Sequence, residues 1–222
     1  MAALRTESVE RAVSILNVFS AEKTSFSLAE LAKETGLHKS TILRLTTSLG
    51  LHGFIDRNDD GIFTLGANIW RLGLIFQQSH FHRDDIQPML SELVGFTGET
   101  AVFYVKSGNE RVCLFRKNSP NMLRFHLEEG MRLPLNLSAS GMVLKRYSGE
   151  MMTDLSVFNK HGTTVAVGIR NPHIVSIATP VFSASGSLLG ALAVSGLQTR
   201  FSKKLRNKTI PLLEKLSAQL AS

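Results

Sequence analysis

The chain has 222 residues, of which 43% are hydrophobic and 19% charged, and its formal net charge is +7. This length fits one large domain or two modest ones, and the composition excludes a disordered or fibrous chain. No apolar run reaches the roughly 18 residues of a membrane-spanning helix, so we expect no membrane partner. Glu7 and Glu10 fall within the first twenty residues, which do not resemble a signal peptide. The single cysteine, Cys113, excludes an internal disulfide and fits a cytoplasmic location.

The positive charge is unevenly distributed along the chain. Residues 1–80 carry eight basic and eight acidic side chains, whereas residues 81–222 carry seventeen and ten. The net charge of the whole chain therefore says little about nucleic acid binding, and the local arrangement of side chains has to decide.

Two helices are predicted first. The earlier one is capped by Thr6 or Ser8 and has a helical spacing of apolar residues. Its apolar face comprises Val9, Ala12, Val13, Leu16 and Phe19. The second helix is predicted over residues 27–35, because Ser27 and Glu30 form a capping box and Gly36 can end the helix in a left-handed conformation.

A third helix is predicted over residues 37–49, with Ile42, Leu45 and Leu49 on its apolar face. The opposite face is small, polar and basic, and comprises Ser40, Arg44 and Thr47, flanked by Thr41 and Ser48. Residues 36–55 contain no acidic side chain. A helix that enters the major groove needs such short polar groups and a long arginine. The pattern therefore predicts a helix-turn-helix that binds DNA.

A hairpin is predicted next, because residues 53–57 and 62–65 alternate as strands around an Asp60-Gly61 turn. This hairpin would be the wing of the domain, and Arg57 at its edge is a candidate for a phosphate or minor-groove contact. An alternative stays open for the whole region. The protein would then be a sensor or interaction protein that uses the helix-turn-helix only for dimerisation. Lys39 and Arg44 would in that case be solvent-exposed residues without a DNA contact. The absence of a net charge in residues 1–80 favours this alternative.

The remaining elements predict an α+β domain. Residues 68–76 form a helix that is apolar on more than one side, covered by a partner subunit or by the chain's own domains. A helix over 86–96 follows, capped by Asp84 or Asp85. The predicted strands cover residues 99–105, 111–116, 123–127, 174–182 and 188–195. A final helix covers 202–221. An antiparallel-rich sheet with helices at both ends of its sequence is typical of the α+β class.

Several motifs together resemble the IclR family of regulators. The N-terminal motifs are SVERA at 8–12, LA at 31–32, GLHKST at 36–41, RL at 44–45, GFI at 53–55 and FTLG at 63–66. The C-terminal motifs are GMRLPL at 130–135, ASG at 139–141 and SIATPV at 176–181. The resemblance covers most of the chain in the right order, which makes it more specific than a lone helix-turn-helix.

The resemblance implies a multi-domain fold. It has a mainly α winged helix-turn-helix domain over 1–66, a linker helix over 67–82 and a GAF-like α+β effector-binding domain over 83–222. It also implies a homodimer or a dimer of dimers that binds double-stranded DNA at a palindromic operator. The DNA contacts carried over from the family are Lys39, Ser40, Thr41 and Arg44, which agree with the polar helix face; Thr47 and Arg57 complete the candidates.

An effector pocket is expected at the loop and helix start 137–141 and at the terminal hairpin opposite. Small residues let a ligand approach the backbone, and a helix N-terminus attracts anions. The candidate residues are Ser138, Ala139, Ser140, Gly141, Ser176, Ala178 and Ser195, with Ser176 carried over from the family. The alternative is that Ser140 and Gly141 only cap a helix and that the strand serines face solvent. Together with the basic charge of this half, the pattern predicts an organic or aromatic acid as effector.

Two departures from the family bear on this pocket. Only about twenty residues separate Gly141 from the strand near residue 163, where relatives place further helices. Residues 165–169 are apolar where many relatives are acidic.

Enzymatic chemistry finds little support in the sequence. Residues 139–141 do not form a G-x-S-x-G nucleophile elbow. The seven histidines show no zinc-binding spacing, and there is no phosphate-binding glycine loop. Cys113 lies in an alternating apolar run, which favours a buried core residue. We therefore expect a binding protein without catalytic residues, metal or cofactor.

Overall fold

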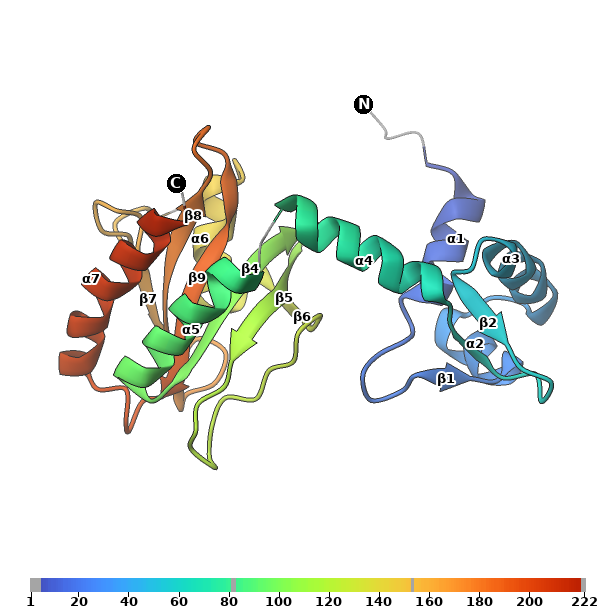
Figure 1. Cartoon of the computed structure of the whole chain (residues 1–222), viewed down its shortest axis with the longest axis horizontal. Coiled ribbons are helices and arrows are strands. Elements are labelled where there is room, and N and C mark those ends of the chain that lie inside the picture. The colour runs from blue at the N-terminus through green and yellow to red at the C-terminus, as the bar shows by residue number, and fades with distance from the viewer. Residues whose placement is uncertain (1–4, 81–82, 153, 221–222) are drawn as a thin grey trace. The chain divides into compact units, whose positions relative to one another are not determined.

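The computed structural model describes residues 5–80, 83–152 and 154–220 (Figure 1). The chain divides into two compact units, Met1–Ser79 and His80–Ser222. This division falls inside the predicted linker segment 67–82, and the predicted domain limits themselves stay predictions.

The N-terminal unit combines helices with a small antiparallel sheet. Its helices are α1 (Glu7–Leu16), α2 (Leu28–Thr35), α3 (Lys39–Leu51) and α4 (Ala67–His80). Strands β1 (Ser25–Phe26), β2 (Ile55–Arg57) and β3 (Phe63–Leu65) pair in the order β1-β3-β2. The core of this unit contains Ile15, Phe26, Leu31, Ile42, Ile55 and Phe63. The predicted helix-turn-helix and wing are therefore confirmed as elements.

Local sequence signals fix the turn between α2 and α3. The Ser27 side chain accepts a hydrogen bond from the Glu30 backbone, and the Glu30 carboxylate accepts one from Ser27 N at 2.8 Å, so the predicted capping box is confirmed. Gly36 ends α2 at φ 69°, in the left-handed region that favours glycine. The third helix begins at Lys39, with His38 as its N-cap, two residues later than predicted.

The predicted apolar face of the first helix is wrong in part. Ile15 is the residue that points into the core, fully buried, whereas Val9 and Val13 are 59% and 46% exposed. Ala12 and Leu16 of this helix are half-buried, and Phe19, which the prediction placed in the helix, follows its end at Leu16 and packs half-buried against the core. Strand β1 was not predicted, because two residues carry no periodicity; it exists through the pairing of Phe26 with Phe63.

The C-terminal unit is built on a six-stranded antiparallel sheet. Its strands are β4 (Thr100–Ser107), β5 (Glu110–Lys117), β6 (Arg132–Pro134), β7 (Thr164–Val167), β8 (Ile174–Phe182) and β9 (Leu188–Leu197), in the order β6-β5-β4-β9-β8-β7. Helices α5 (Arg83–Thr97) and α7 (Lys203–Gln219) cover one face. The short helix η1 (Leu135–Leu137) precedes α6 (Ala139–Tyr147), which covers the other face (Figure 1). The predicted α+β class is confirmed.

Alternation along each strand divides the core between the two faces of the sheet. Phe103 and Ile177 point toward α5 and α7, whereas Tyr104 and Ala178 point toward α6. In β8 and β9, Ser176 lies directly opposite Ser195. Ser176 Oγ accepts a hydrogen bond from Ala139 N at 3.2 Å, which fixes this pair of serines on the α6 face.

Two predictions for this unit are wrong. Residues 123–127 form no strand; β6 occupies the free edge of β5 instead, and the carbonyl of Phe125 accepts a hydrogen bond from Thr100 Oγ1 at 3.4 Å. Asp84 and Asp85 do not precede the helix as caps, because α5 begins at Arg83 and includes both in its first turn. The remaining predicted strands and the last helix are present within a few residues of the expected limits.

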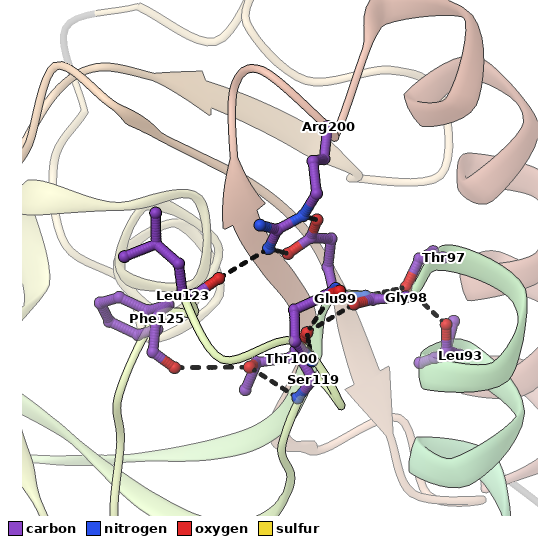
Figure 2. A network of polar contacts seen from close by, with 10 residues as sticks. Leu93, Thr97, Gly98, Glu99, Thr100, Ser119, Leu123, Phe125 and Arg200 are labelled. Carbon is purple, nitrogen blue, oxygen red and sulfur yellow. Dashed lines mark hydrogen bonds and ion pairs between the residues drawn. The ribbon is translucent and has the colours of Figure 1, made fainter.

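Side-chain hydrogen bonds hold the loop after β5 against the start of β4 (Figure 2). Ser119 Oγ donates to the carbonyl of Gly98 at 2.6 Å, and Ser119 N donates to Thr100 Oγ1 at 3.1 Å. The same network contains the ion pair of Glu99 with Arg200. The loop therefore has a defined position although it belongs to no sheet.

Candidate nucleic-acid interface and ligand pocket

The outward face of α3 carries the predicted DNA-binding residues. Lys39, Ser40, Arg44 and Thr47 are exposed and Thr41 is half-buried, while Ile42 on the other side is fully buried. No ion pair joins Lys39 or Arg44 to any other residue in the described part of the chain. Their charges are therefore not neutralised by the protein, as a phosphate-binding surface requires.

The hydroxyl groups of α3 are partly engaged within the helix. Thr47 Oγ1 donates to the carbonyl of Leu43 at 2.8 Å, which leaves its oxygen free to accept. The N-cap residue, His38, makes no side-chain capping bond. The N–H groups of Lys39 and Ser40 therefore have no capping side chain and can donate to a phosphate, whereas Thr41 N already donates to the carbonyl of His38.

The wing positions Arg57. The guanidinium lies over the ring of Phe63, 5.1 Å from its centroid, and the residue is exposed at the end of β2. Asn58 closes the turn by accepting a hydrogen bond from Ile62 N at 2.8 Å, and Gly61 has φ 79°. Stacking restricts Arg57 to the surface of the hairpin without neutralising its charge.

The N-terminal unit exposes large apolar side chains on two of its helices. Trp70 on α4 is 70% exposed and Ile75 is 49% exposed. Val9 and Val13 on α1 are also exposed. Apolar surface of this kind is typical of a protein–protein contact.

The C-terminal unit contains a cavity of about 150 Å³ between the α6 face of the sheet and the start of α6. Its lining is partly hydroxylated, partly aromatic or apolar, and partly basic. The lining residues are Tyr104, Arg111, Phe125, Ser138, Ser140, Ala166, Ile169, Arg170, Asn171, Ile174, Ser176 and Ser195. Four of the seven predicted effector residues, all serines, thus come together here.

These serines also hold the start of α6 on the sheet. Ser138 caps the helix by accepting a hydrogen bond from Gly141 N at 3.1 Å, and its oxygen lies 3.1 Å from that of Ser140. Ser176 accepts from Ala139 N, as described above. The cavity therefore has a floor of ordered hydroxyl groups.

The other three predicted residues do not line the cavity. Ala139 and Ala178 are fully buried in the core beneath α6. A Cβ at Gly141 would lie 1.7 Å from the carbonyl oxygen of Leu135, so this glycine permits the close approach of η1 and α6. At these positions small side chains permit packing of α6.

Arg111 is a site residue that sequence reasoning missed. It is 2% exposed, its Nη1 donates to the carbonyl of Pro134, and its guanidinium lies 5.1 Å above the ring centroid of Tyr104. Its Nε is buried and has no hydrogen-bond partner within the described residues. Burial lowers the pKa of Arg111 and raises that of Tyr104. The sequence does contain a signal for this residue. Arg111 lies two residues before Cys113 in an alternating strand, so both are predicted to be buried, and a buried arginine is unusual.

Arg170 and Asn171 were also missed. Both are exposed in the turn between β7 and β8 and line the cavity from that side. No residue of the lining is acidic, so the cavity is positively charged. Its aromatic and apolar walls, hydroxylated floor and two arginines form a pocket suited to a small organic anion.

Two further observations concern metal ions and the single cysteine in the described residues. They include no group of three or more His, Cys, Asp or Glu side chains that could hold a metal ion. Cys113 is fully buried, and burial raises the pKa of its thiol to about 12, so the thiol is protonated at neutral pH. In the same part of the chain, no helix is long and apolar enough to cross a bilayer.

Comparison with known proteins points to one family. The family model of the IclR helix-turn-helix domain matches residues 8–59, and the model of the bacterial transcriptional regulator IclR C-terminal region matches residues 147–222. Together they cover more than half of the chain. The HTH-type transcriptional regulator XynR of Escherichia coli is 27% identical over 220 residues, covering 87% of either chain.

Solved structures show the same fold. A crystal structure from Silicibacter sp. TM1040, assigned to the IclR transcriptional regulators, has a TM-score of 0.80 at 22% identity and covers 96% of this chain and 94% of its own. An IclR homologue from Microbacterium hydrocarbonoxydans, solved in complex with 4-hydroxybenzoate, has a TM-score of 0.74 at 19% identity, with coverage of 97% and 98%.

Proposed function

The chain belongs to the IclR family of transcriptional regulators, and we propose that a small organic acid in the cavity of the C-terminal unit controls its binding to a palindromic operator in the cytoplasm. The proposal of DNA binding is supported by the exposed face of α3, on which Lys39 and Arg44 form no ion pair within the described residues.

Each polar residue of this interface has an expected role. Arg44 is central on the exposed face and long enough to reach a base edge in the major groove. Lys39, Ser40, Thr41 and Thr47 would contact phosphates or base edges around it. Arg57, stacked on the wing, would contact a phosphate or the minor groove beside the recognition helix.

A homodimer, or a dimer of dimers, accounts for the exposed apolar residues of α1 and α4. Trp70 at 70% exposure is unusual for a monomer, and a second copy of the chain would cover it. Two-fold symmetry of the protein also matches a palindromic operator, in which two half-sites are read by two copies of α3.

The effector would be an organic or aromatic acid. Arg111 and Arg170 supply positive charge, and the lining contains no acidic side chain. A cavity of about 150 Å³ accepts a benzene-sized group, because an engineered cavity of about this volume in another protein binds benzene. The Microbacterium homologue binds 4-hydroxybenzoate, an acid of this class. Binding would change operator affinity by a coupling free energy, typically about 1–3 kcal/mol.

The test is selection from genomic DNA fragments across a salt series, with wild-type protein, Arg44→Ala and Lys208→Ala. Lys208 is exposed on α7 in the C-terminal unit and serves as a charge-matched control. Wild type and Lys208→Ala are expected to enrich one palindromic site, and Arg44→Ala to lose that preference. Absence of enrichment at low salt, with and without candidate acids, would refute operator binding.

A second candidate function uses the helix-turn-helix only for dimerisation in a small-molecule sensor. The equal numbers of basic and acidic side chains in residues 1–80 favour it. In that case the protein would bind acids and dimerise through the N-terminal unit, yet bind DNA without sequence preference.

A further inference from the structure

We propose that the cavity is a site for a small dicarboxylate, with one carboxylate bound by Arg111 and the other by Arg170. This inference rests on the proposed effector role of the cavity and specifies the chemical class of the ligand. Its basis is the position of two unneutralised arginines on different sides of one small cavity.

Arg111 provides the inner binding point. Its side chain is 98% buried, yet no carboxylate among the described residues pairs with it, and its Nε lacks a hydrogen-bond partner. The guanidinium stays protonated even in such surroundings. A buried charge without a counterion is unfavourable, because no ion pair offsets the loss of its hydration. A carboxylate beside Nε would supply both the missing charge and the missing acceptor.

Arg170 provides the second binding point from the other side of the cavity. Arg111 belongs to β5, and Arg170 follows β7; strands β4, β9 and β8 lie between them. Four inter-strand spacings of about 4.8 Å separate β5 from β7, which amounts to roughly 19 Å measured along the sheet. Both side chains nevertheless line the same cavity, and the charge of Arg170 contributes to the lowered pKa of Arg111. The exposed Arg170 thus adds a second positive charge to the cavity, on a different side from the buried Arg111.

The lining between the arginines suits the carbon part of such a ligand. Phe125, Ile169, Ile174 and Ala166 provide apolar walls, and Ser176 and Ser195 provide hydroxyl groups on the floor. About 150 Å³ fits a ring or a chain of a few carbon atoms. A ligand with one carboxylate would pair with Arg111 and would make no ionic contact with Arg170.

A phosphate group is the other small dianion, and the geometry disfavours it. Phosphate sites use several free N–H groups at a helix N-terminus. At the start of α6, Ala139 N already donates to Ser176 and Gly141 N to Ser138.

The experiment compares matched ligands by calorimetry on the full-length protein. The probes are succinate and succinamate, which differ by one charge at equal size, then phthalate and benzoate, and inorganic phosphate. The variants are Arg111→Gln, Arg170→Gln and, as a control, Lys208→Gln. We expect at least one dicarboxylate to bind at least tenfold more tightly than its singly charged partner. Arg170→Gln should abolish this ratio, and Lys208→Gln should preserve it.

Arg111→Gln should remove binding of every acid while the protein stays folded. Because a buried uncompensated charge is lost, its melting temperature without ligand should be equal to or higher than that of wild type. Any one of four results would overturn the dicarboxylate site. Two concern affinity ratios: equal affinity for the two members of each ligand pair, or an unchanged ratio in Arg170→Gln. The other two are binding of phosphate alone and no binding of any probe.

The effector role is tested separately by repeating the operator measurement with each probe. If singly charged acids shift operator affinity as strongly as dicarboxylates, the dicarboxylate inference fails and the effector function stands. If a dicarboxylate binds with the expected ratio and leaves operator affinity unchanged, the site stands and the effector function fails.

Discussion

Arg200 binds the buried carboxylate of Glu99 through two hydrogen bonds, from Nε at 2.9 Å and from Nη2 at 3.0 Å. Glu99 is 1% exposed, at the junction of α5 and β4, and Arg200 follows β9. Nη2 of Arg200 also donates to the carbonyl of Leu123 at 2.9 Å (Figure 2). The ion pair therefore joins the centre of the sheet to the loop whose Phe125 lines the cavity.

Removing Arg200 should destabilise the C-terminal unit. In Arg200→Met the carboxylate of Glu99 stays buried without its counterion, and loss of one partner of a buried pair costs about 3–5 kcal/mol. Because Arg200 is about one-third exposed, we expect a smaller loss, about 2 kcal/mol, in urea unfolding. Glu99→Gln combined with Arg200→Met should recover part of it. A loss below about 0.5 kcal/mol would show that the pair contributes little. Hydrogen exchange of residues 121–125 should increase in the single variant.

Gly141 tests the packing of η1 against α6. A Cβ at this position would lie 1.7 Å from Leu135 O and 2.5 Å from its carbonyl carbon, both backbone atoms that cannot rotate away. We expect Gly141→Ala to cost about 3 kcal/mol of unfolding free energy, the upper part of the range for overpacking.

The matched control is Gly95→Ala in α5, where a Cβ meets nothing within 4 Å. Alanine favours a helix over glycine by about 1 kcal/mol, so this variant should be as stable as wild type or more so. Equal effects of the two substitutions would contradict the close approach at Gly141.

Local signals predicted the N-terminal unit well. The capping box at Ser27, the left-handed Gly36 and the Asp60-Gly61 turn each act within a few residues, so the sequence contains them completely. The rotation of α1 depends on which neighbours pack against it, and the spacing of Val9 and Val13 did not identify Ile15 as the core residue. Contacts with distant parts of the chain determine which face of α1 is buried, and the local spacing of apolar residues does not distinguish between its faces.

The pocket was predictable only in part for the same reason. Hydroxyl groups at 138, 140, 176 and 195 follow from local turn and strand patterns together with the family resemblance. Arg111 and Arg170 share the cavity because the strand order places β5 and β7 on two sides of one curled face, which no short-range pattern states. Arg111 nevertheless occupies a position of β5 that the alternation of the strand predicts to be buried, and arginine is rare at buried positions.

Glu30 should make the N-terminal unit sensitive to acid. Hydrogen bonds from Lys23 Nζ and from the backbone and hydroxyl of Ser27 lower the pKa of its carboxyl from 4.5 to about 2. A pKa that is lower in the folded state stabilises that state above the unfolded pKa. This stabilisation is therefore complete above about pH 4.5 and is lost as the pH falls toward 2.

The measurement is the difference in melting temperature between wild type and Glu30→Gln across this range. The difference should be constant from pH 7 to 5 and should shrink between pH 4.5 and 2. Glu34→Gln, an exposed position on the same helix, is the control. A difference that does not change with pH would contradict the role of the charged carboxylate.

Arg57 should contribute to DNA affinity without setting the sequence preference. Arg57 is exposed at the edge of the wing and its guanidinium stacks on Phe63, where it would contact the DNA backbone beside the proposed recognition helix α3. Loss of one phosphate contact lowers the salt slope of binding by about 1 and weakens all sequences nearly equally. Arg57→Ala should therefore reduce affinity for the operator and for random duplex by the same factor. Arg44→Ala should reduce the ratio between them. If Arg57→Ala changes this ratio more than Arg44→Ala does, the wing reads sequence and the assignment of the two arginines must be exchanged.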